Sequence, residues 1–415
     1  MGYPVLYTRP GPPGQVFSVL ITKVCRFVAD YPTRGEATYG LQPVFVNLSE
    51  EQVRMGYEVH VVARRSPGQL PSETVNGVQV HRVLDPFNLT AFNVSLRLTH
   101  GERGWVLHPH ATSGIFLSLT RNCLPTPLVC HSHGTTRSHS VPLSVDDGEV
   151  RIGTSVREPH LHTSREKFFW SSADRLLVVS KAVMRDVTQF YGISPERIRI
   201  VYNGVDTNVF CPSDGGPLPA QIASLEGKQI VLFVGHFGLR KGILYLIRAM
   251  KSVKKEFPDA ALVCVGGTPK WLGGTDYKQL LKEETIRSDV ADSVTLLDAV
   301  KHSELVEFYR HSEVFVLPTY YEAFSKVVVE AMACSKPIVA SKTGAIPELV
   351  DDGATGFLVP FGDPDVTAEK LRILLGDKGM RDSMGRRGRE RAESQFTWRA
   401  VAERTKSAYD ELDSR

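Results

Sequence analysis

The chain has 415 residues, of which 42% are hydrophobic and 23% are charged, and its formal net charge is +3. Its length exceeds what one ordinary core supports and predicts two domains of roughly 200 residues each. The mild charge argues against a nucleic-acid partner, and the sequence has no apolar run long enough to cross a membrane. The first residues lack a signal-peptide pattern, so we expect a cytoplasmic protein, with an alternative location at the inner face of the membrane.

Short apolar runs alternate with helical stretches through the first half. The first run covers residues 17–21 and precedes a helix-like stretch from 41 to 55. Most runs are continuously apolar, which is typical of parallel strands buried on both faces. Scattered cysteines in such runs are interpreted as small buried hydrophobic residues. The remaining predicted strands of this half cover 58–63, 78–83, 105–108, 128–131 and 175–179.

Histidines gather near two of these predicted strands. His108 and His110 are two residues apart, and so are His131 and His133. Alternation along a strand places both rings of such a pair on one face. Histidines are also metal ligands. No nearby carboxylate or thiol has ligand spacing, so we predict no metal.

The second half repeats the strand and helix rhythm after a stretch rich in proline and glycine between residues 206 and 221. The pattern predicts two open α/β sheets with helices on both sides. A ligand shared by two such sheets would lie in the cleft at the carboxyl ends of their strands. The predicted strands cover 230–234, 261–265, 294–297, 314–317, 338–340 and 356–359.

A glycine-rich turn with a basic pair follows the first strand of this second half. Gly235 and Gly238 allow the backbone to approach a ligand closely. Lys241 supplies a point charge suited to phosphate. A surface turn with solvated arginine and lysine is the alternative interpretation.

Two glutamates follow the predicted strand 314–317. Glu322 lies in the loop after it, and Glu330 lies on a helix predicted over 325–336, with Ser325 as its N-cap. Open amides at the start of that helix favour an anionic group. Two carboxylates beside a positive helix end suit a ligand with hydroxyl groups at both ends and phosphate between them, which is the layout of a nucleotide sugar.

These two segments resemble the retaining family-4 glycosyltransferases of the GT-B fold. Lys241 matches the lysine of the family's Gly-Arg-x-x-x-x-Lys-Gly turn, whereas His236 stands in place of its diphosphate-binding arginine, a role that Arg240 is an alternative candidate to fill. The stretch from Glu322 is similar to the Glu-Gly-Phe-Gly-x-x-x-x-Glu signature. The resemblance implies that Glu330 binds the donor ribose and that Glu322 contacts the transferred sugar.

The resemblance also implies backbone contacts to the sugar and diphosphate. They would come from Gly235 and from Phe324, Ser325, Lys326 and Val327 in the loop before the second glutamate. Small residues stand where the family has glycines, and Lys326 stands where an apolar residue is usual. We expect the Lys326 ammonium group to point to solvent.

Two first-half loops are similar to family segments as well. The loop with Gly35 resembles the Gly-Gly-x-Glu loop under the donor diphosphate, and His133 matches the histidine that faces the transferred sugar. Residues 363–365 look like a metal-binding Asp-x-Asp motif but follow the last strand, so we interpret them as a turn. Loop arginines that could bind an anionic acceptor or a lipid surface are Arg137, Arg151, Arg157 and Arg165.

The resulting hypothesis is a GT-B enzyme with two Rossmann-like doubly wound domains facing across a cleft. We predict an acceptor domain at 1–205, a nucleotide-sugar domain at 206–390, and a helix at 391–415 that crosses back. The resemblance implies metal-independent transfer of a hexose from a nucleotide-diphosphate sugar to a glycan, glycolipid or small-molecule hydroxyl, in glycan biosynthesis, with no cofactor. The alternatives are a phosphorolytic enzyme, a sugar-nucleotide epimerase and a nucleotide-sugar-binding protein without catalysis.

Overall fold

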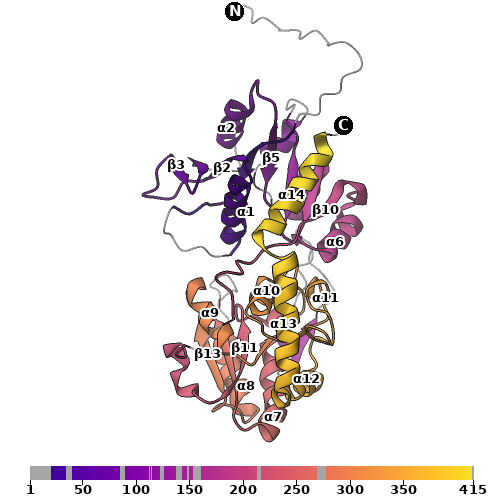
Figure 1. Cartoon of the computed structure of the whole chain (residues 1–415). Coiled ribbons are helices and arrows are strands. Elements are labelled where there is room, and N and C mark those ends of the chain that lie inside the picture. The colour runs from indigo at the N-terminus through magenta and orange to yellow at the C-terminus, as the bar shows by residue number, and fades with distance from the viewer. Residues whose placement is uncertain are drawn as a thin grey trace, which may run out of the picture.

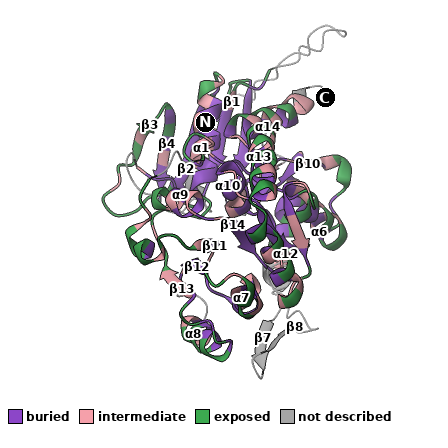
Figure 2. Ribbon diagram, turned by 60° about the horizontal axis from the view of Figure 1, so that its bottom comes forward, coloured by how far each residue is buried: buried purple, intermediate pink, exposed green. Residues whose placement is uncertain are grey.

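The computed structural model describes residues 20–33, 40–84, 89–111, 113, 115–121, 126–136, 143–146, 149–152, 160–212, 216–268 and 277–413. Two sheets form two halves of the molecule, and the last helices span both (Figure 1). Buried residues concentrate in the sheets, and exposed residues lie on the outer sides of the helices (Figure 2). Within the described residues, no helix combines the length and hydropathy that a membrane span requires.

The first sheet is parallel except for one edge hairpin. Its strand order is β3-β4-β2-β1-β5, and a three-stranded parallel sheet in the order β6-β9-β10 continues it through the parallel bridges Leu107–Leu128 and His110–His131. The chain leaves β1 toward β2 and later returns to β5 on the other side, so the strand order reverses between β1 and β5. The strands are β1 (Lys23–Phe27), β2 (Glu58–Arg64), β3 (Ser72–Val75), β4 (Val78–Val83), β5 (Trp105–Pro109), β6 (Val129–Ser132), β9 (Arg175–Val178) and β10 (Ile198–Ile200).

Helices cover both faces of this first sheet. The residues of β1 alternate, so Val24 faces α1 and Cys25 faces the opposite side, and the two faces belong to separate apolar clusters. Antiparallel strands β7 (Leu143–Asp146) and β8 (Glu149–Ile152) form a separate hairpin. The helices of this half are α1 (Gln42–Arg54), α2 (Leu89–Thr99), α3 (Ile115–Leu119), α5 (His160–Ser172) and α6 (Lys181–Tyr191).

The second sheet is parallel throughout, in the order β13-β12-β11-β14-β15-β16. The chain runs from β11 outward to β13, then returns to β14 and runs outward the other way. Right-handed crossovers in opposite directions place helices on opposite faces. The strands are β11 (Gln229–Val234), β12 (Ala260–Gly266), β13 (Val294–Asp298), β14 (Val314–Leu317), β15 (Ile338–Ser341) and β16 (Gly356–Val359).

The helices of the second half end in a long pair. They are α7 (Ile243–Glu256), α8 (Tyr277–Arg287), α9 (His302–Arg310), α10 (Lys326–Ala333), α11 (Ile346–Leu349), α12 (Pro364–Gly376) and α13 (Lys378–Gln395). The last helix, α14 (Trp398–Asp413), leaves α13 and lies against the first half (Figure 1). Its Val401 and Tyr409 join the apolar cluster of α1 and β1. The Tyr409 hydroxyl also forms a hydrogen bond with His108 Nδ1 of β5.

Three expectations about the elements need correction. Strand β1 lies at Lys23–Phe27 rather than at 17–21, where residues 17–19 fall outside the described residues. Its apolar run is interrupted by Arg26, which is fully buried. Helix α10 ends at Ala333 rather than at 336, because Ser335 takes a left-handed conformation with φ of 59°. Residues 363–365 begin helix α12, where the Asp363 carboxylate accepts from the Val366 amide as an N-cap.

Candidate active site

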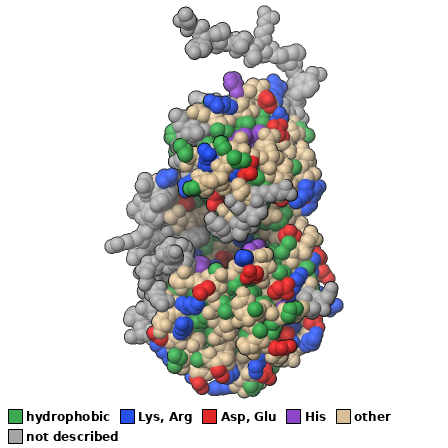
Figure 3. Space-filling model, turned by 90° about the vertical axis from the view of Figure 1, so that its left-hand side faces the viewer, with side chains coloured by type: hydrophobic (Ala, Val, Ile, Leu, Met, Phe, Trp, Pro, Cys, Tyr) green, Lys and Arg blue, Asp and Glu red, His purple; other side chains and the backbone are tan. Residues whose placement is uncertain are grey.

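Both sheets reverse their strand order at a point where ligands bind in such folds. In open α/β sheets the ligand crevice lies beyond the carboxyl ends of the strands, at the reversal of order. The reversals fall between β1 and β5 in the first sheet and between β11 and β14 in the second. Figure 3 shows a hollow between the two halves with histidine and basic side chains at it.

The loops after β11 and β14 are in direct contact. The Tyr320 amide donates to the Arg240 carbonyl at 2.7 Å, and the Thr319 hydroxyl donates to the same oxygen at 3.0 Å. Gly242 has φ of +68°, and a Cβ there would come within 1.9 Å of the Pro318 carbonyl oxygen. Glycine is therefore required for this approach. The contact brings the predicted lysine and glutamate together.

Lys241 and Glu322 form an ion pair across these loops. Lys241 Nζ lies 2.5 Å from Glu322 Oε1, and both side chains are about one-seventh exposed, at 15% and 14%. Thr319 Oγ1 lies 3.1 Å from the same carboxylate oxygen, so its single proton can turn from the Arg240 carbonyl to Glu322. The pair is accessible enough to meet a ligand and enclosed enough to interact more strongly than a surface pair.

Glu330 lies further along α10 and is buried. Its Oε1 lies 3.0 Å from His302 Nε2, and its Oε2 accepts from the Tyr309 hydroxyl at 2.9 Å. Burial, and next the Glu330 charge, raises the pKa of Tyr309, so its hydroxyl stays a donor. Each carboxylate oxygen retains a second lone pair for a ligand hydroxyl. Sequence reasoning missed both partners, because no pattern near them indicates a contact with a distant glutamate.

The amino terminus of α10 faces the other half of the molecule. Ser325 has an extended N-cap conformation, but its side chain makes no capping bond, and its buried Oγ has no partner within the described part of the chain. The Lys326 ammonium group donates to the Gly40 carbonyl in the first half. The expectation that Lys326 points to solvent is therefore wrong. Phe324 is buried against Tyr202 and Phe396, so its side chain has a packing role.

His236 and Arg240, the two candidates to replace the family's diphosphate-binding arginine, differ in charge. Burial, and next the nearby Lys241, lowers the pKa of His236 to about 4. His236 is therefore neutral at pH 7 and adds no positive charge. Burial lowers the pKa of Arg240, while the Glu322 charge raises it. An arginine keeps its proton near neutral pH, so Arg240 is the residue of the two that carries charge.

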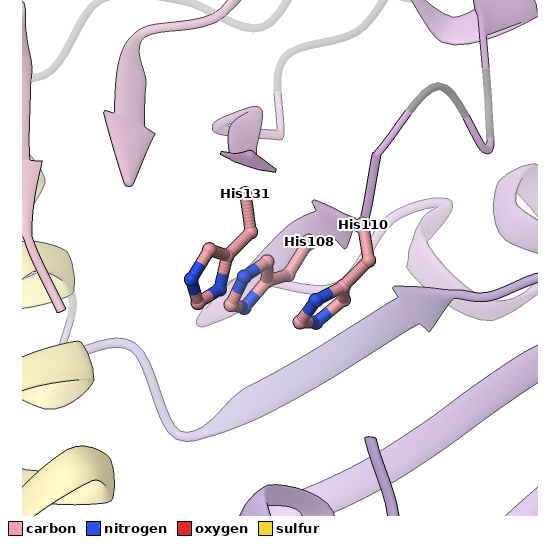
Figure 4. Close-up of side chains that lie close together, drawn as sticks. All are labelled: His108, His110 and His131. Carbon is pink, nitrogen blue, oxygen red and sulfur yellow. The ribbon is translucent and has the colours of Figure 1, made fainter. Parts of the chain in front are cut away.

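His133 belongs to a row of stacked histidines at the carboxyl ends of β5 and β6. The His108 and His110 ring centroids lie 4.6 Å apart, and those of His131 and His133 also lie 4.6 Å apart. Each pair shares one face of the sheet, as strand alternation predicts. Figure 4 shows the rings of His108, His110 and His131 side by side, with their planes facing one another.

Several contacts join the two halves beside these groups. The Glu348 carboxylate accepts from the Lys181 and Ala182 amides at 2.7 and 2.9 Å, at the start of α6. The Tyr321 hydroxyl donates to Asp186 Oδ2 at 2.6 Å. These bonds hold the loop that carries Glu322 against the first half.

The remaining predicted positions lie partly outside the described residues and partly around the loops after β11 and β14 and on α5. Gly35, Arg137 and Arg157 lie outside the described residues, as does the side chain of Arg151. Arg165 is exposed on α5. Gly235 begins the loop after β11. A side chain at this position would be crowded, because a Cβ there would lie 3.2 Å from the Phe233 ring. Val327 is half-buried in the first turn of α10.

Comparisons with known proteins agree with this arrangement. The model "Glycosyl transferases group 1" matches residues 217–391, and "Glycosyltransferase Family 4" matches residues 39–209. The D-inositol 3-phosphate glycosyltransferase of Kineococcus radiotolerans is 31% identical over 408 residues, 91% of each chain. The alpha-maltose-1-phosphate synthase of Mycolicibacterium smegmatis is 32% identical over 258 residues, 59% of this chain and 64% of that one.

Solved structures share the fold. Sucrose-phosphate synthase from Thermosynechococcus elongatus superposes with a TM-score of 0.74 at 23% identity, over 95% of this chain and 99% of that one. HepE of Anabaena, solved in complex with UDP-glucose, gives a TM-score of 0.68 at 18% identity, over 95% of this chain and 100% of that one.

The fold and the relatives define the class of this protein. It is a GT-B glycosyltransferase with two Rossmann-like domains. This chain belongs to the family-4 glycosyltransferases. It is an enzyme that moves a sugar from a nucleotide sugar to an acceptor.

Proposed function

We propose that the chain transfers a hexose from a nucleotide-diphosphate sugar to an acceptor hydroxyl, with retention of the anomeric configuration and without a metal or cofactor. The observation that carries the proposal is the Lys241–Glu322 ion pair beside the amino terminus of α10, with buried Glu330 further along the same helix. This arrangement combines a lysine and the open amides of a helix start, which suit a diphosphate, with two carboxylates that can accept from sugar hydroxyls.

The proposed roles combine what the family resemblance implies with the charges found at the site. The difficult step is departure of a diphosphate, and Lys241, Arg240 and the first amides of α10 would stabilise its growing charge. Glu330 would accept from the ribose hydroxyls, and Glu322 would bind the transferred sugar. As the bond from the anomeric carbon to the phosphate oxygen breaks, the acceptor oxygen bonds to that carbon on the same face. The leaving phosphate oxygen takes the acceptor's proton, so no protein base is required.

The acceptor is proposed at the level of its class. Two relatives at 31% and 32% identity are a D-inositol 3-phosphate glycosyltransferase and an alpha-maltose-1-phosphate synthase, whose names refer to small phosphorylated molecules. They favour a small hydroxylated acceptor over a glycan or a lipid-linked one. A cytoplasmic location and a peripheral contact with the membrane remain predictions.

The test measures donor hydrolysis and sugar transfer by purified protein over a panel of nucleotide sugars. Lys241→Ala and Glu330→Ala should each lower kcat/KM by about a hundredfold or more, because each removes a charge that contacts the donor. Lys228→Ala is the matched control, since it breaks an exposed ion pair with Asp259. It should leave turnover unchanged.

Thermal melting should show that all three variants fold. Full activity in both Lys241→Ala and Glu330→Ala would reject the proposal. Nucleotide-sugar binding without any turnover in the wild type would favour a binding protein instead, and interconversion of nucleotide sugars would favour an epimerase.

A further inference from the structure

The histidine row at the carboxyl ends of β5 and β6 is not explained by the proposed catalytic step. Nitrogen atoms of His108, His110 and His131 lie within 4.8 Å of one another. The rings are stacked, with interplanar angles of 14° for His108–His110 and 16° for His108–His131. Stacked rings direct their nitrogen lone pairs along parallel planes rather than toward one centre, so the geometry does not suit a tetrahedral metal site.

Both nitrogens of His110 already have partners, and one partner is a buried cation. Arg26 Nη1 lies 3.0 Å from His110 Nε2, and His110 Nδ1 lies 2.8 Å from His133 Nε2. A guanidinium group only donates hydrogen bonds. His110 Nε2 must therefore accept, which places the proton of neutral His110 on Nδ1.

The same reasoning continues to the next ring. His110 Nδ1–H donates to His133 Nε2, so His133 Nε2 must accept. The proton of neutral His133 is then on Nδ1. That Nδ1 atom is buried and has no hydrogen-bond partner among the residues that the structure describes. His133 thus has one N–H donor left for a ligand.

Electrostatics keep the ring neutral. Burial, and next the charges of Lys326 and Arg26, lowers the pKa of His133 to about 3. Burial also lowers the pKa of His110 well below its usual value. The Arg26 side chain is held in turn by the Gln52 side-chain carbonyl of α1. Arg26 lies on β1, whose end borders the strand reversal of the first sheet.

We propose that Arg26 and His110 are positioning residues that hold the proton of His133 on Nδ1, so that His133 donates a hydrogen bond to a hydroxyl oxygen of the bound sugar. This inference rests on the proposed function, because it takes His133 to face the donor sugar. A ring with the opposite tautomer would present a lone pair there and would favour a different hydroxyl orientation.

Nitrogen NMR of ¹⁵N-histidine-labelled protein tests the tautomer directly. The signal of His133 is assigned by its loss in His133→Gln. In the wild type, Nδ1 of His133 should have the shift of a protonated nitrogen and Nε2 that of an unprotonated one. The reverse pattern would overturn the proposal, whether or not any Arg26 variant folds.

Arg26→Gln and Arg26→Lys form a matched pair of variants. The side-chain amide of glutamine can either donate to or accept from His110 Nε2, so it does not fix the position of the His110 proton. The lysine ammonium group can only donate, as the arginine does. Arg26→Gln should give mixed His133 tautomers and a tenfold to hundredfold loss of kcat/KM, about the value of one mispaired hydrogen bond. Arg26→Lys should restore the wild-type tautomer and most of the activity.

The outcomes separate this inference from the proposed function. If Lys241→Ala and Glu330→Ala leave turnover unchanged, the proposed function fails. The role of Arg26 and His110 in sugar binding then fails with it. If those variants lose turnover and Arg26→Gln changes the His133 tautomer without lowering kcat/KM, the proposed hydrogen bond from His133 to the sugar fails while the proposed function stands. One tightly held zinc ion per chain, lost in His110→Gln, would also overturn it.

Discussion

Gly344 determines where the Glu322 backbone lies. It has φ of +53°, and a Cβ there would come within 2.3 Å of the Glu322 carbonyl oxygen. The next residue, Ala345, donates its amide to that same oxygen at 2.8 Å. Because the clash is with backbone, a side chain at Gly344 must move the loop that carries the ion pair.

Gly344→Ala should therefore impair catalysis beyond its cost in stability. We expect at least a tenfold fall in kcat/KM, since small displacements of catalytic groups are costly. Gly353→Ala is the control: Gly353 also has positive φ, at +75°, but a Cβ there meets nothing within 4 Å. Both should lower the melting temperature through backbone strain. Equal kcat/KM in the two variants would show that Gly344 does not position Glu322.

At the scale of the element, α14 depends on one close contact with the first half. The Trp398 ring, at the start of α14, lies where a Cβ on Gly204 would come within 2.6 Å of it. The Val205 amide donates to the Phe396 carbonyl at 2.8 Å in the same region. The crossing of the chain back to the first half is therefore tightly packed here.

Gly204→Ala should lower the melting temperature by several degrees, because overpacking of this kind costs about 1–3 kcal/mol. Gly216→Ala, where a Cβ meets nothing within 4 Å, should change it little. Thermal unfolding followed by circular dichroism measures both. A melting temperature for Gly204→Ala equal to that of the control would contradict the proposed docking of α14.

Most strands could be predicted from the sequence because their residues are continuously apolar. Predictions failed where a charged residue is buried inside a strand. Arg26 is buried in β1, and its charge interrupts the apolar run by which this strand would be recognised. Short elements such as β3 and β10 also escaped, since four or three residues carry little pattern. Residue order alone could not reveal that Lys326 reaches Gly40, because that contact joins the two halves.

The site was predictable only in part for a similar reason. Lys241 and Glu322 lie in recognisable segments, and the structure brings them together. His302 and Tyr309 contact Glu330 from another helix, and nothing in their own segment indicates it. Contacts between distant segments depend on topology, which local patterns do not specify.

At the scale of the whole molecule, the buried histidines make stability depend on pH. The pKa of His133 falls to about 3, chiefly through burial, against about 6.5 in an unfolded chain. Between these values the unfolded chain binds a proton that the folded chain does not. The free energy of unfolding should therefore fall as pH drops below about 6.5.

This single histidine should cost about 2 kcal/mol between pH 6.5 and pH 5. Denaturant unfolding at pH 7, 6 and 5 measures the slope, in a window where most carboxylates stay ionised. His133→Gln should unfold with a shallower pH dependence. An unchanged slope in that variant would mean that His133 is not buried as a neutral ring.

The central claim is that the donor diphosphate lies between the two halves, at the Lys241–Glu322 pair and the start of α10. A crystal structure with a bound nucleotide sugar tests it most directly. We expect the diphosphate within hydrogen-bond distance of Lys241 Nζ and the first amides of α10, with the ribose hydroxyls on Glu330. A nucleotide bound elsewhere, with Glu330 contacting only His302 and Tyr309, would contradict the account.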